Sequence, residues 1–239
     1  MELDALAFGA HADDVELHCG GTIAMLAARG HRVGVVALTR GEMATRGSAE
    51  TRAKEFAEAA GILGLAAHWM LDIPDARVEA TWENKLKVIE VLRAFRPKIV
   101  FAPYWTDRHP DHEHASRLVR EAAYLSGLNK IEVSGPAFRP AKIVFYQGRY
   151  EFAPSFIVDI SEAQDRKMKA IRAYRTQFPP GGGETPIARP EFLDFIEARD
   201  RRFGSAIGAK FGEPFLVREA IRVEDPVAFF GAGPAATIP

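Results

Sequence analysis

The chain lacks several features that mark particular classes of protein. It has one cysteine, Cys19, among 239 residues, so no intrachain disulfide can form and a reducing, cytoplasmic compartment is expected. No run of about 18 or more apolar residues occurs, which argues against a membrane-spanning helix. The first residues include acids where a secretory signal peptide would carry basic residues. These absences predict a soluble, cytoplasmic protein.

The chain also lacks an excess of charge of either sign. It contains 31 Lys and Arg residues and 32 Asp and Glu residues, for a net charge of −1. A dedicated nucleic-acid binder needs a basic excess to neutralise phosphates, so we expect no nucleic-acid partner. Apolar residues make up 47% of the chain and charged residues 26%, which is typical of a globular domain with a core of ordinary size.

Short apolar runs alternate with amphipathic segments along the first half of the chain. We expect strands at 3–10, 33–38, 68–73 and 98–102. We expect helices at 21–29, 49–63, 81–95 and 112–125. This alternation, with nearly continuous apolar strands, predicts an α/β fold in which helices cover both faces of a mostly parallel sheet.

The second half continues with strands expected at 142–146 and 156–160 and helices at 161–174 and 190–203. Ser161 and Gln164 form a capping-box pattern that predicts a helix beginning at Ser161. The flexible residues 181–183 either hinge a lid or form a passive loop. Without an internal repeat or a domain linker, residues 1–230 are expected to form a single domain. Residues 231–239 are rich in Gly, Ala and Pro, which predicts a frayed tail.

Two polar segments follow expected strands. Residues 11–14 read His-Ala-Asp-Asp after the first strand, and residues 109–112 read His-Pro-Asp-His shortly after the strand at 98–102. The carboxyl ends of parallel strands share one edge of a sheet, so the two segments are expected to meet. Two imidazoles and one carboxylate are a usual catalytic zinc set, and they also admit other divalent metals. The expected metal ligands are His11, Asp14 and His112.

The neighbouring side chains suggest catalytic roles. Asp13 is adjacent to Asp14 but would point differently, so it suits a general base acting on water. A protonated His109 could stabilise negative charge on a substrate oxygen. Asp111 could orient and charge that imidazole.

Alternatives to a metal site remain open for these two segments. Each motif alone is weak, because residues 11–14 could be a polar turn and residues 109–112 a helix start. Gly20 and Gly21 precede a helix, as in a dinucleotide site, but the chain has no G-x-G-x-x-G motif. The acids around residues 13–16 would also repel phosphates, so a metal site is favoured.

The two motifs resemble those of the PIG-L/LmbE-like family of metal-dependent deacetylases, whose first motif is usually A-H-P-D-D-E. Here Ala12 replaces the proline and Glu16 comes one place later, while residues 109–112 match as they stand. Further segments resemble the bacillithiol-biosynthesis branch, which deacetylates N-acetylglucosaminyl-malate. They are 39–42, 45–47, 50–52, 73–75, 126–128, 174–178, 189–192 and 212–215.

The resemblance implies a Rossmann-like fold and zinc-dependent release of acetate from a glucosamine conjugate, with Fe²⁺ as another candidate metal. It implies the metal ligands and catalytic residues named above, with Arg52 contacting substrate and Asp75 accepting hydrogen bonds from sugar hydroxyls. Arg108 is added as a basic residue beside the second motif.

It also implies a small-molecule partner and a homo-oligomer, with the hexamer among the forms that the family takes. Surface salt bridging by Arg52 and a simple turn at Asp75 remain alternatives for those residues. Alternative functions are deacetylation of another N-acetylglucosamine conjugate, a non-catalytic sugar-binding module and a metal-dependent phosphoesterase.

Overall fold

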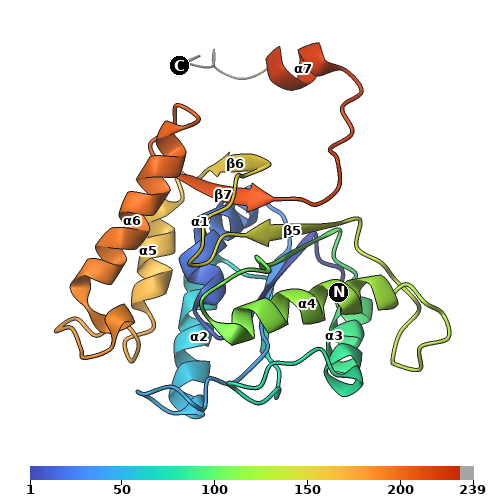
Figure 1. Ribbon diagram of the computed structural model, residues 1–239, viewed down its shortest axis with the longest axis horizontal. Helices are drawn as coiled ribbons and strands as arrows, with labels where there is room; N and C mark the ends of the chain where they lie inside the picture. The colour runs from blue at the N-terminus through green and yellow to red at the C-terminus, as the bar shows by residue number, and fades with distance from the viewer. Residues whose placement is uncertain (232–239) are drawn as a thin grey trace.

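The structure is a computed structural model that describes residues 1–231 (Figure 1). Its strands are β1 Ala5–Gly9, β2 Val33–Ala37, β3 Ala67–Met70, β4 Ile99–Pro103, β5 Lys142–Tyr146, β6 Phe156–Asp159 and β7 Gly212–Leu216. Its helices are α1 Asp14–Ala28, α2 Ala49–Leu63, α3 Trp82–Phe95, α4 Pro110–Leu125, α5 Gln164–Arg172, α6 Pro190–Ser205 and α7 Pro226–Gly231, with a 3-10 turn at Pro186–Ala188.

The strands form one sheet in the order β3-β2-β1-β4-β5-β7-β6. The first five strands in this order are parallel, and β7 pairs antiparallel with both of its neighbours. The predicted α/β fold with a mostly parallel sheet is therefore confirmed. Since β1 and β4 are adjacent and parallel, with Ala7 opposite Phe101, the turns that follow them lie at the same edge of the sheet.

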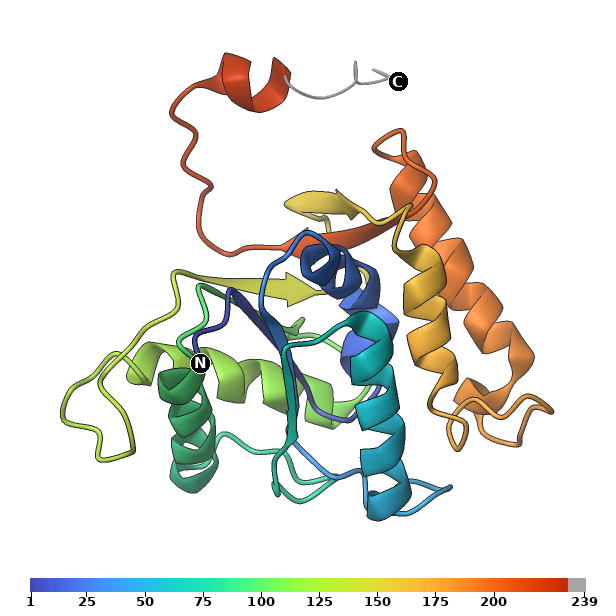
Figure 2. The ribbon, with the colours of Figure 1, turned by 180° about the vertical axis from the view of Figure 1, so that it is seen from behind.

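Two apolar cores lie on opposite faces of the sheet. Successive strand residues alternate between them: Phe8 belongs to the core under α3 and α4, whereas Ala7 belongs to the core under α1, α2, α5 and α6. Figure 2 shows the two green helices, α3 and α4, across the sheet from α2, α5 and α6. This arrangement confirms the prediction of helices on both faces.

Three expectations about the elements are wrong. α1 begins at Asp14 rather than Gly21, because the helix passes through a kink at Cys19 instead of stopping there. β7 was not expected, since Pro214 and a buried acid interrupt its apolar pattern. Ser161 does not cap α5: its Oγ accepts the backbone N–H groups of Lys210 and residue 211, and α5 begins at Gln164.

The end of the described chain extends away from the sheet. After β7 the chain leads to α7, which stands apart from the other helices in both views and has no buried residue (Figures 1 and 2). Of the tail predicted at residues 231–239, Gly231 ends α7 and residues 232–239 lie outside the described residues. Among residues 1–231, no helix combines the length and apolar character needed to cross a membrane.

Candidate active site

The two motifs meet at the floor of a cavity of about 380 Å³. This volume lies in the range of small-molecule sites. Residues 11–14 form the turn from β1 into α1, and residues 107–112 lead from β4 into α4. Pro110 occupies the first turn of α4, where its missing N–H costs nothing, and His109 is the N-cap. The outer walls come from the loop around Met43 and from α6.

His11 lies among three carboxylates. Its backbone N–H donates to Oδ2 of Asp14 at 2.8 Å, and its Nε2 lies 3.1 Å from Oδ1 of Asp75 and 3.4 Å from Oδ2 of Asp111. Burial disfavours the charged form of His11, yet hydrogen bonds to these carboxylates, that of Asp111 the strongest, raise its pKa well above the usual value. The environment therefore favours a positive charge at this ring.

His112 lies between two further carboxylate groups. Its Nε2 lies 3.2 Å from Oδ1 of Asp14, and its Nδ1 lies 3.2 Å from Oδ1 of Asp107. Burial opposes protonation, but the charge of Asp14 and the bond to Asp107 raise the pKa of His112 to about 10. Asp14 thus presents one oxygen to each of the two imidazoles.

Asp107 is a site residue that sequence reasoning missed. Besides His112, its carboxylate accepts the backbone N–H groups of His109 at 2.9 Å and Arg149 at 2.7 Å. Burial raises its pKa, but the bond to His112 and these N–H groups outweigh burial and lower it to about 2. A side chain at Gly148 would collide with Asp107. The available signal was an acid two residues before His109, at the exit of a buried strand.

Asp13 points away from Asp14, toward Arg52. The backbone of Asp13 has a φ of 129°, a value that residues other than glycine rarely adopt. Nη1 of Arg52 donates to Oδ2 of Asp13 and to the carbonyl of Ala12, both at 3.2 Å. Burial raises the pKa of Asp13, and the charge of Arg52 acts in the opposite direction. Arg52 is itself only 5% exposed, so the alternative of a solvated surface salt bridge is wrong.

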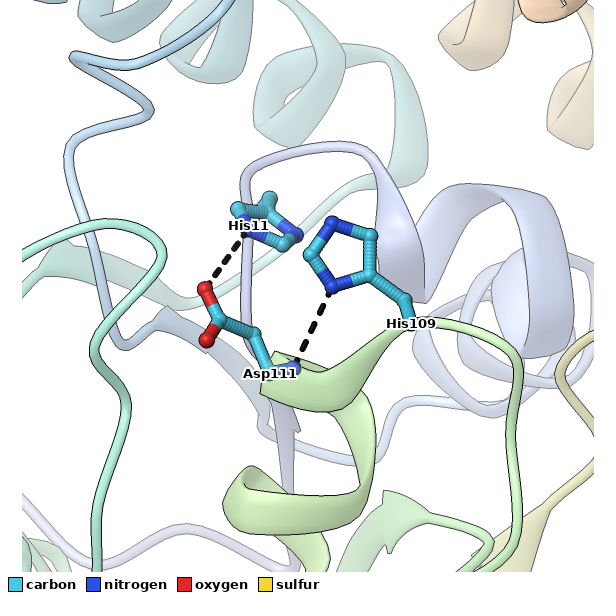
Figure 3. A group of neighbouring side chains, drawn as sticks. All are labelled: His11, His109 and Asp111. Atoms are coloured by element: carbon cyan, nitrogen blue, oxygen red, sulfur yellow. Dashed lines mark hydrogen bonds and ion pairs between the residues drawn. The ribbon is translucent and has the colours of Figure 1, made fainter.

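His109 and Asp111 do not pair as expected. Figure 3 shows the His109 ring facing His11, and Nδ1 of His109 accepts the backbone N–H of Asp111 at 3.2 Å. The Asp111 carboxylate instead faces His11 and accepts the N–H groups of Ala76 and Val78. Burial and then the charges of the other two imidazoles lower the pKa of His109. Because Nδ1 accepts the backbone N–H of Asp111, Nε2 is the nitrogen of His109 that can donate to a bound molecule.

The residues expected to bind substrate lie at different depths. Asp75 lines the cavity, and its Oδ1 and Oδ2 accept the N–H groups of Ala76 at 2.8 Å and Met43 at 3.0 Å. Asp75 therefore also holds the loop around Met43 in place. Arg108 is exposed at the cavity mouth.

Loops 43–46 and 176–185 are fastened together beside the cavity. The Arg46 guanidinium donates to the carbonyls of Thr176 and Gln177 and to the hydroxyl of Thr185. The glycine-containing segment 181–183 is thereby anchored on both sides.

Among residues 1–231, two groups of side chains could hold a metal ion, each with ligand atoms within 4.8 Å of one another: His11–Asp14–His112 and His11–His109–Asp111. Metal-bound imidazoles usually donate their second nitrogen to a carboxylate. The first group has this arrangement, because Asp107 lies behind His112 and Asp75 lies near Nε2 of His11. In the second group, Nδ1 of His109 and both oxygens of Asp111 already bond to backbone N–H groups. The structure therefore favours the first group for a divalent metal.

A match to a family model and a similar deacetylase identify the family of the chain. Residues 6–123 match the family model described as GlcNAc-PI de-N-acetylase, PIG-L. Diacetylchitobiose deacetylase from Thermococcus kodakarensis is 33% identical over 211 residues, which cover 82% of this chain and 79% of that protein.

Solved structures are similar over almost the whole chain. The conserved protein TT1542 from Thermus thermophilus is 42% identical with a TM-score of 0.86, covering 93% of this chain and 98% of that one. N,N'-diacetylchitobiose deacetylase from Pyrococcus horikoshii, complexed with an inhibitor, is 29% identical with a TM-score of 0.79. The match covers 97% of this chain and 86% of that one.

Proposed function

Because the chain belongs to the GlcNAc-PI de-N-acetylase (PIG-L) family, we propose that it hydrolyses the N-acetyl group of a glucosamine conjugate with a bound divalent metal. The observation that carries this proposal is the convergence of His11, Asp14 and His112 beside the separately oriented Asp13. The relatives named deacetylases in Thermococcus and Pyrococcus support the same reaction.

The proposed metal is Zn²⁺, held by His11, Asp14 and His112, and Fe²⁺ would suit the same nitrogen and oxygen donors. Such an ion supplies Lewis-acid chemistry and lowers the pKa of water toward about 7. The carboxylates that raise the pKa values of both imidazoles would equally stabilise a cation between them.

Asp13, Arg52 and His109 have separate roles in the proposed reaction. Asp13 takes a proton from the attacking water, and Arg52 keeps its carboxylate oriented. Water adds to the acetyl carbonyl, and Nε2–H of His109 donates to the oxygen on which negative charge develops. Asp13 then gives its proton to the departing nitrogen as the C–N bond breaks, which releases acetate and the free amine.

The proposed substrate is N-acetylglucosaminyl-malate, as in bacillithiol biosynthesis. Arg108 and Arg149 both line the cavity and are exposed at its mouth, where guanidinium groups can bind the carboxylates of an aglycone. Asp75 lies deeper, beside His11, and is proposed to face the sugar hydroxyls. Another N-acetylglucosamine conjugate is the alternative within the same reaction.

The test is a screen of acetate release with the metal-loaded protein. The substrates are N-acetylglucosamine, its malate and inositol conjugates, and chitooligosaccharides. We expect the malate conjugate to have the highest kcat/KM, and Arg108→Ala to raise KM for it several-fold more than for N-acetylglucosamine. Arg166→Ala, an exposed arginine on α5, is the matched control. No acetate from any substrate, or phosphate release from a phosphorylated sugar instead, would overturn the proposal.

A further inference from the structure

α1 kinks at the wall of the cavity, and side chains replace the hydrogen bonds that the kink removes. The kink is at Cys19, with φ −142° and ψ 17°. In a continuous helix the N–H of Gly21 would bond to the carbonyl of Leu17. Here the N–H of Gly21 donates to Oε1 of Glu213 at 2.9 Å, and the carbonyl of Leu17 accepts from Nη2 of Arg199 at 2.6 Å.

The charges of these two side chains are linked through a buried network. Lys167 Nζ lies 2.8 Å from Oε1 of Glu213 and 2.6 Å from Oδ2 of Asp200. Oδ1 of Asp200 in turn accepts from Arg199 at 3.0 Å. Two acids alternate with two bases, so the network is neutral and its buried charges are all paired. Arg199 is consequently held in one position.

Arg199 determines which nitrogen of His18 carries the proton. Nη1 of Arg199 lies 3.0 Å from Nδ1 of His18. A guanidinium can only donate and remains charged, so Nδ1 must accept and the proton must lie on Nε2. Burial and then the charge of Arg199 lower the pKa of His18 to about 3, which keeps the ring neutral. The ring also stacks on Tyr146, with centroids 5.9 Å apart.

His18 belongs to the wall of the cavity, one helical turn after Asp14. Arg199 on α6 contacts it, and the same helix lines the cavity with Phe192 and Ile196. Within residues 1–231 no protein group accepts from Nε2 of His18, and this nitrogen is not among the buried atoms sealed from solvent. A donor fixed by the fold therefore remains available to a bound molecule.

The charged groups around His18 determine which kind of oxygen can accept a hydrogen bond from its Nε2–H. The charged groups that act on the ring are Arg199 from α6, Asp14 from α1, and Asp107 and His112 at the start of α4. Two of these groups are positive and two are negative, and each positive charge is already paired with a carboxylate of the protein. No unpaired positive charge is therefore left at this position to neutralise an anion. The fitting partner is an uncharged acceptor, a sugar hydroxyl or an amide carbonyl.

We propose that His18 is a substrate-binding residue whose Nε2–H donates to an uncharged oxygen of the bound sugar conjugate, and that Arg199 is the positioning residue that fixes this tautomer. The proposal extends the proposed function, because it concerns the same cavity. Its basis is the geometry of the Arg199–His18 contact and of the cavity wall.

The tautomer can be measured without any activity assay. The protein is labelled with ¹⁵N-histidine, and the NMR signals of His18 are assigned as those that disappear in His18→Gln. We expect these signals to show an unprotonated Nδ1 and a protonated Nε2. In Arg199→Met we expect both tautomers, and in Arg199→Lys, which keeps a donor, we expect the single tautomer to return. An Nδ1–H ring in the wild-type protein, or a His18 that is charged near neutral pH, would overturn the proposal.

Binding is tested with a matched pair of amides. Glutamine can place an N–H near the position of Nε2, whereas asparagine is too short to reach it. We expect His18→Asn to raise KM for the preferred conjugate by about tenfold, the loss of about one hydrogen bond, with kcat changed less than about threefold. His18→Gln should stay within about threefold of the wild-type protein in both constants. His114→Asn, on the exposed side of α4, is the control.

Calorimetric measurement of ligand binding tests the role of His18 independently of the proposed deacetylase activity. Binding of N-acetylglucosamine and its deoxy analogues is measured with metal-loaded protein, whether or not acetate is released. We expect His18→Asn to weaken binding of N-acetylglucosamine about tenfold and to have no effect on the deoxy analogue that lacks the accepted hydroxyl. If the amide carbonyl is the acceptor, the loss persists in every deoxy analogue and disappears with glucosamine. Equal binding by the wild-type protein and His18→Asn would overturn the proposal even if deacetylation is observed.

Discussion

Nη1 of Arg52 lies 3.2 Å from Oδ2 of Asp13, and both side chains are buried at the floor of the cavity. The positive φ of Asp13 turns its carboxylate toward Arg52, while Asp14 faces the two imidazoles. Two adjacent acids therefore have different surroundings. Burial raises the pKa of Asp13, whereas the charge of His112 and the hydrogen bonds to both imidazoles together outweigh burial at Asp14 and lower its pKa well below the usual value. This separation suits one acid for proton transfer and the other for a cation.

The choice between the two candidate metal groups predicts unequal effects of two histidine substitutions. His112→Ala should abolish binding of one Zn²⁺ per chain, because it removes a ligand of the favoured group. His109→Ala should retain the ion while reducing acetate release. Metal content after dialysis against buffer measures both. Loss of the ion in His109→Ala and retention in His112→Ala would favour the other group.

Asp107 is not a proposed metal ligand, but its contact with His112 predicts that it affects metal affinity. Asp107→Asn should weaken Zn²⁺ binding about 10- to 100-fold, because the carboxylate behind His112 orients that ring and raises its basicity. Competition with a chelator measures the affinity, and the exposed Asp165→Asn serves as the control. Unchanged affinity would show that Asp107 only organises the backbone around His109.

Sequence reasoning located the two motifs because their positions depend on a simple property of the fold. The expected strands at 3–10 and 98–102 became β1 and β4, and their parallel pairing brings residues 11–14 and 109–112 together. The hydrogen-bond partners of each side chain were harder to predict from the sequence. Asp111 was expected behind His109, but the loop containing Ala76 supplies backbone N–H groups that turn its carboxylate toward His11.

Long-range contacts explain the errors in the fold as well. β7 contains Pro214 and is stabilised by pairing with β6 rather than by its own apolar pattern. The kink of α1 at Cys19 depends on Glu213 and Arg199, which are about 180 to 195 residues further along the chain. Local patterns do not reveal such partners.

The stability of the fold should depend on the ionisation of Asp4. The side chain of Lys98, followed by the backbone N–H of Arg32, lowers the pKa of Asp4 from 3.8 to about 2. A lowered folded pKa stabilises the fold above the unfolded value, and this contribution is lost as the pH falls through the folded value. The difference in urea midpoint between the wild-type protein and Asp4→Asn should therefore shrink from about pH 5 downward.

The matched control for this pH effect is Lys98→Met, which removes the largest cause of the shift. In that background Asp4→Asn should have a smaller and flatter effect. A difference between wild type and Asp4→Asn that stays constant from about pH 7 to about pH 3 would contradict the linkage.

Two glycines predict opposite effects of added methyl groups. A Cβ at Gly21 would lie 2.6 Å from Cδ1 of Ile160, so Gly21→Ala should destabilise the protein by about 1–3 kcal/mol. A Cβ at Gly61, inside α2, would meet nothing within 4 Å. Gly61→Ala should therefore stabilise the helix by roughly 0.5–1 kcal/mol. Urea unfolding measures both, and a destabilising Gly61→Ala or a neutral Gly21→Ala would contradict the packing described here.

The most direct measurement of the proposed reaction is acetate release from an N-acetylglucosamine conjugate by the Zn²⁺-loaded protein, compared with Asp13→Asn loaded in the same way. Asparagine keeps the size of the side chain but cannot accept the proton, so both proteins should bind one ion. The wild-type protein should release acetate and free amine in equal amounts, and the variant should be slower by about 100-fold or more. Equal rates in the two proteins, or no acetate from the wild-type protein, would contradict the account.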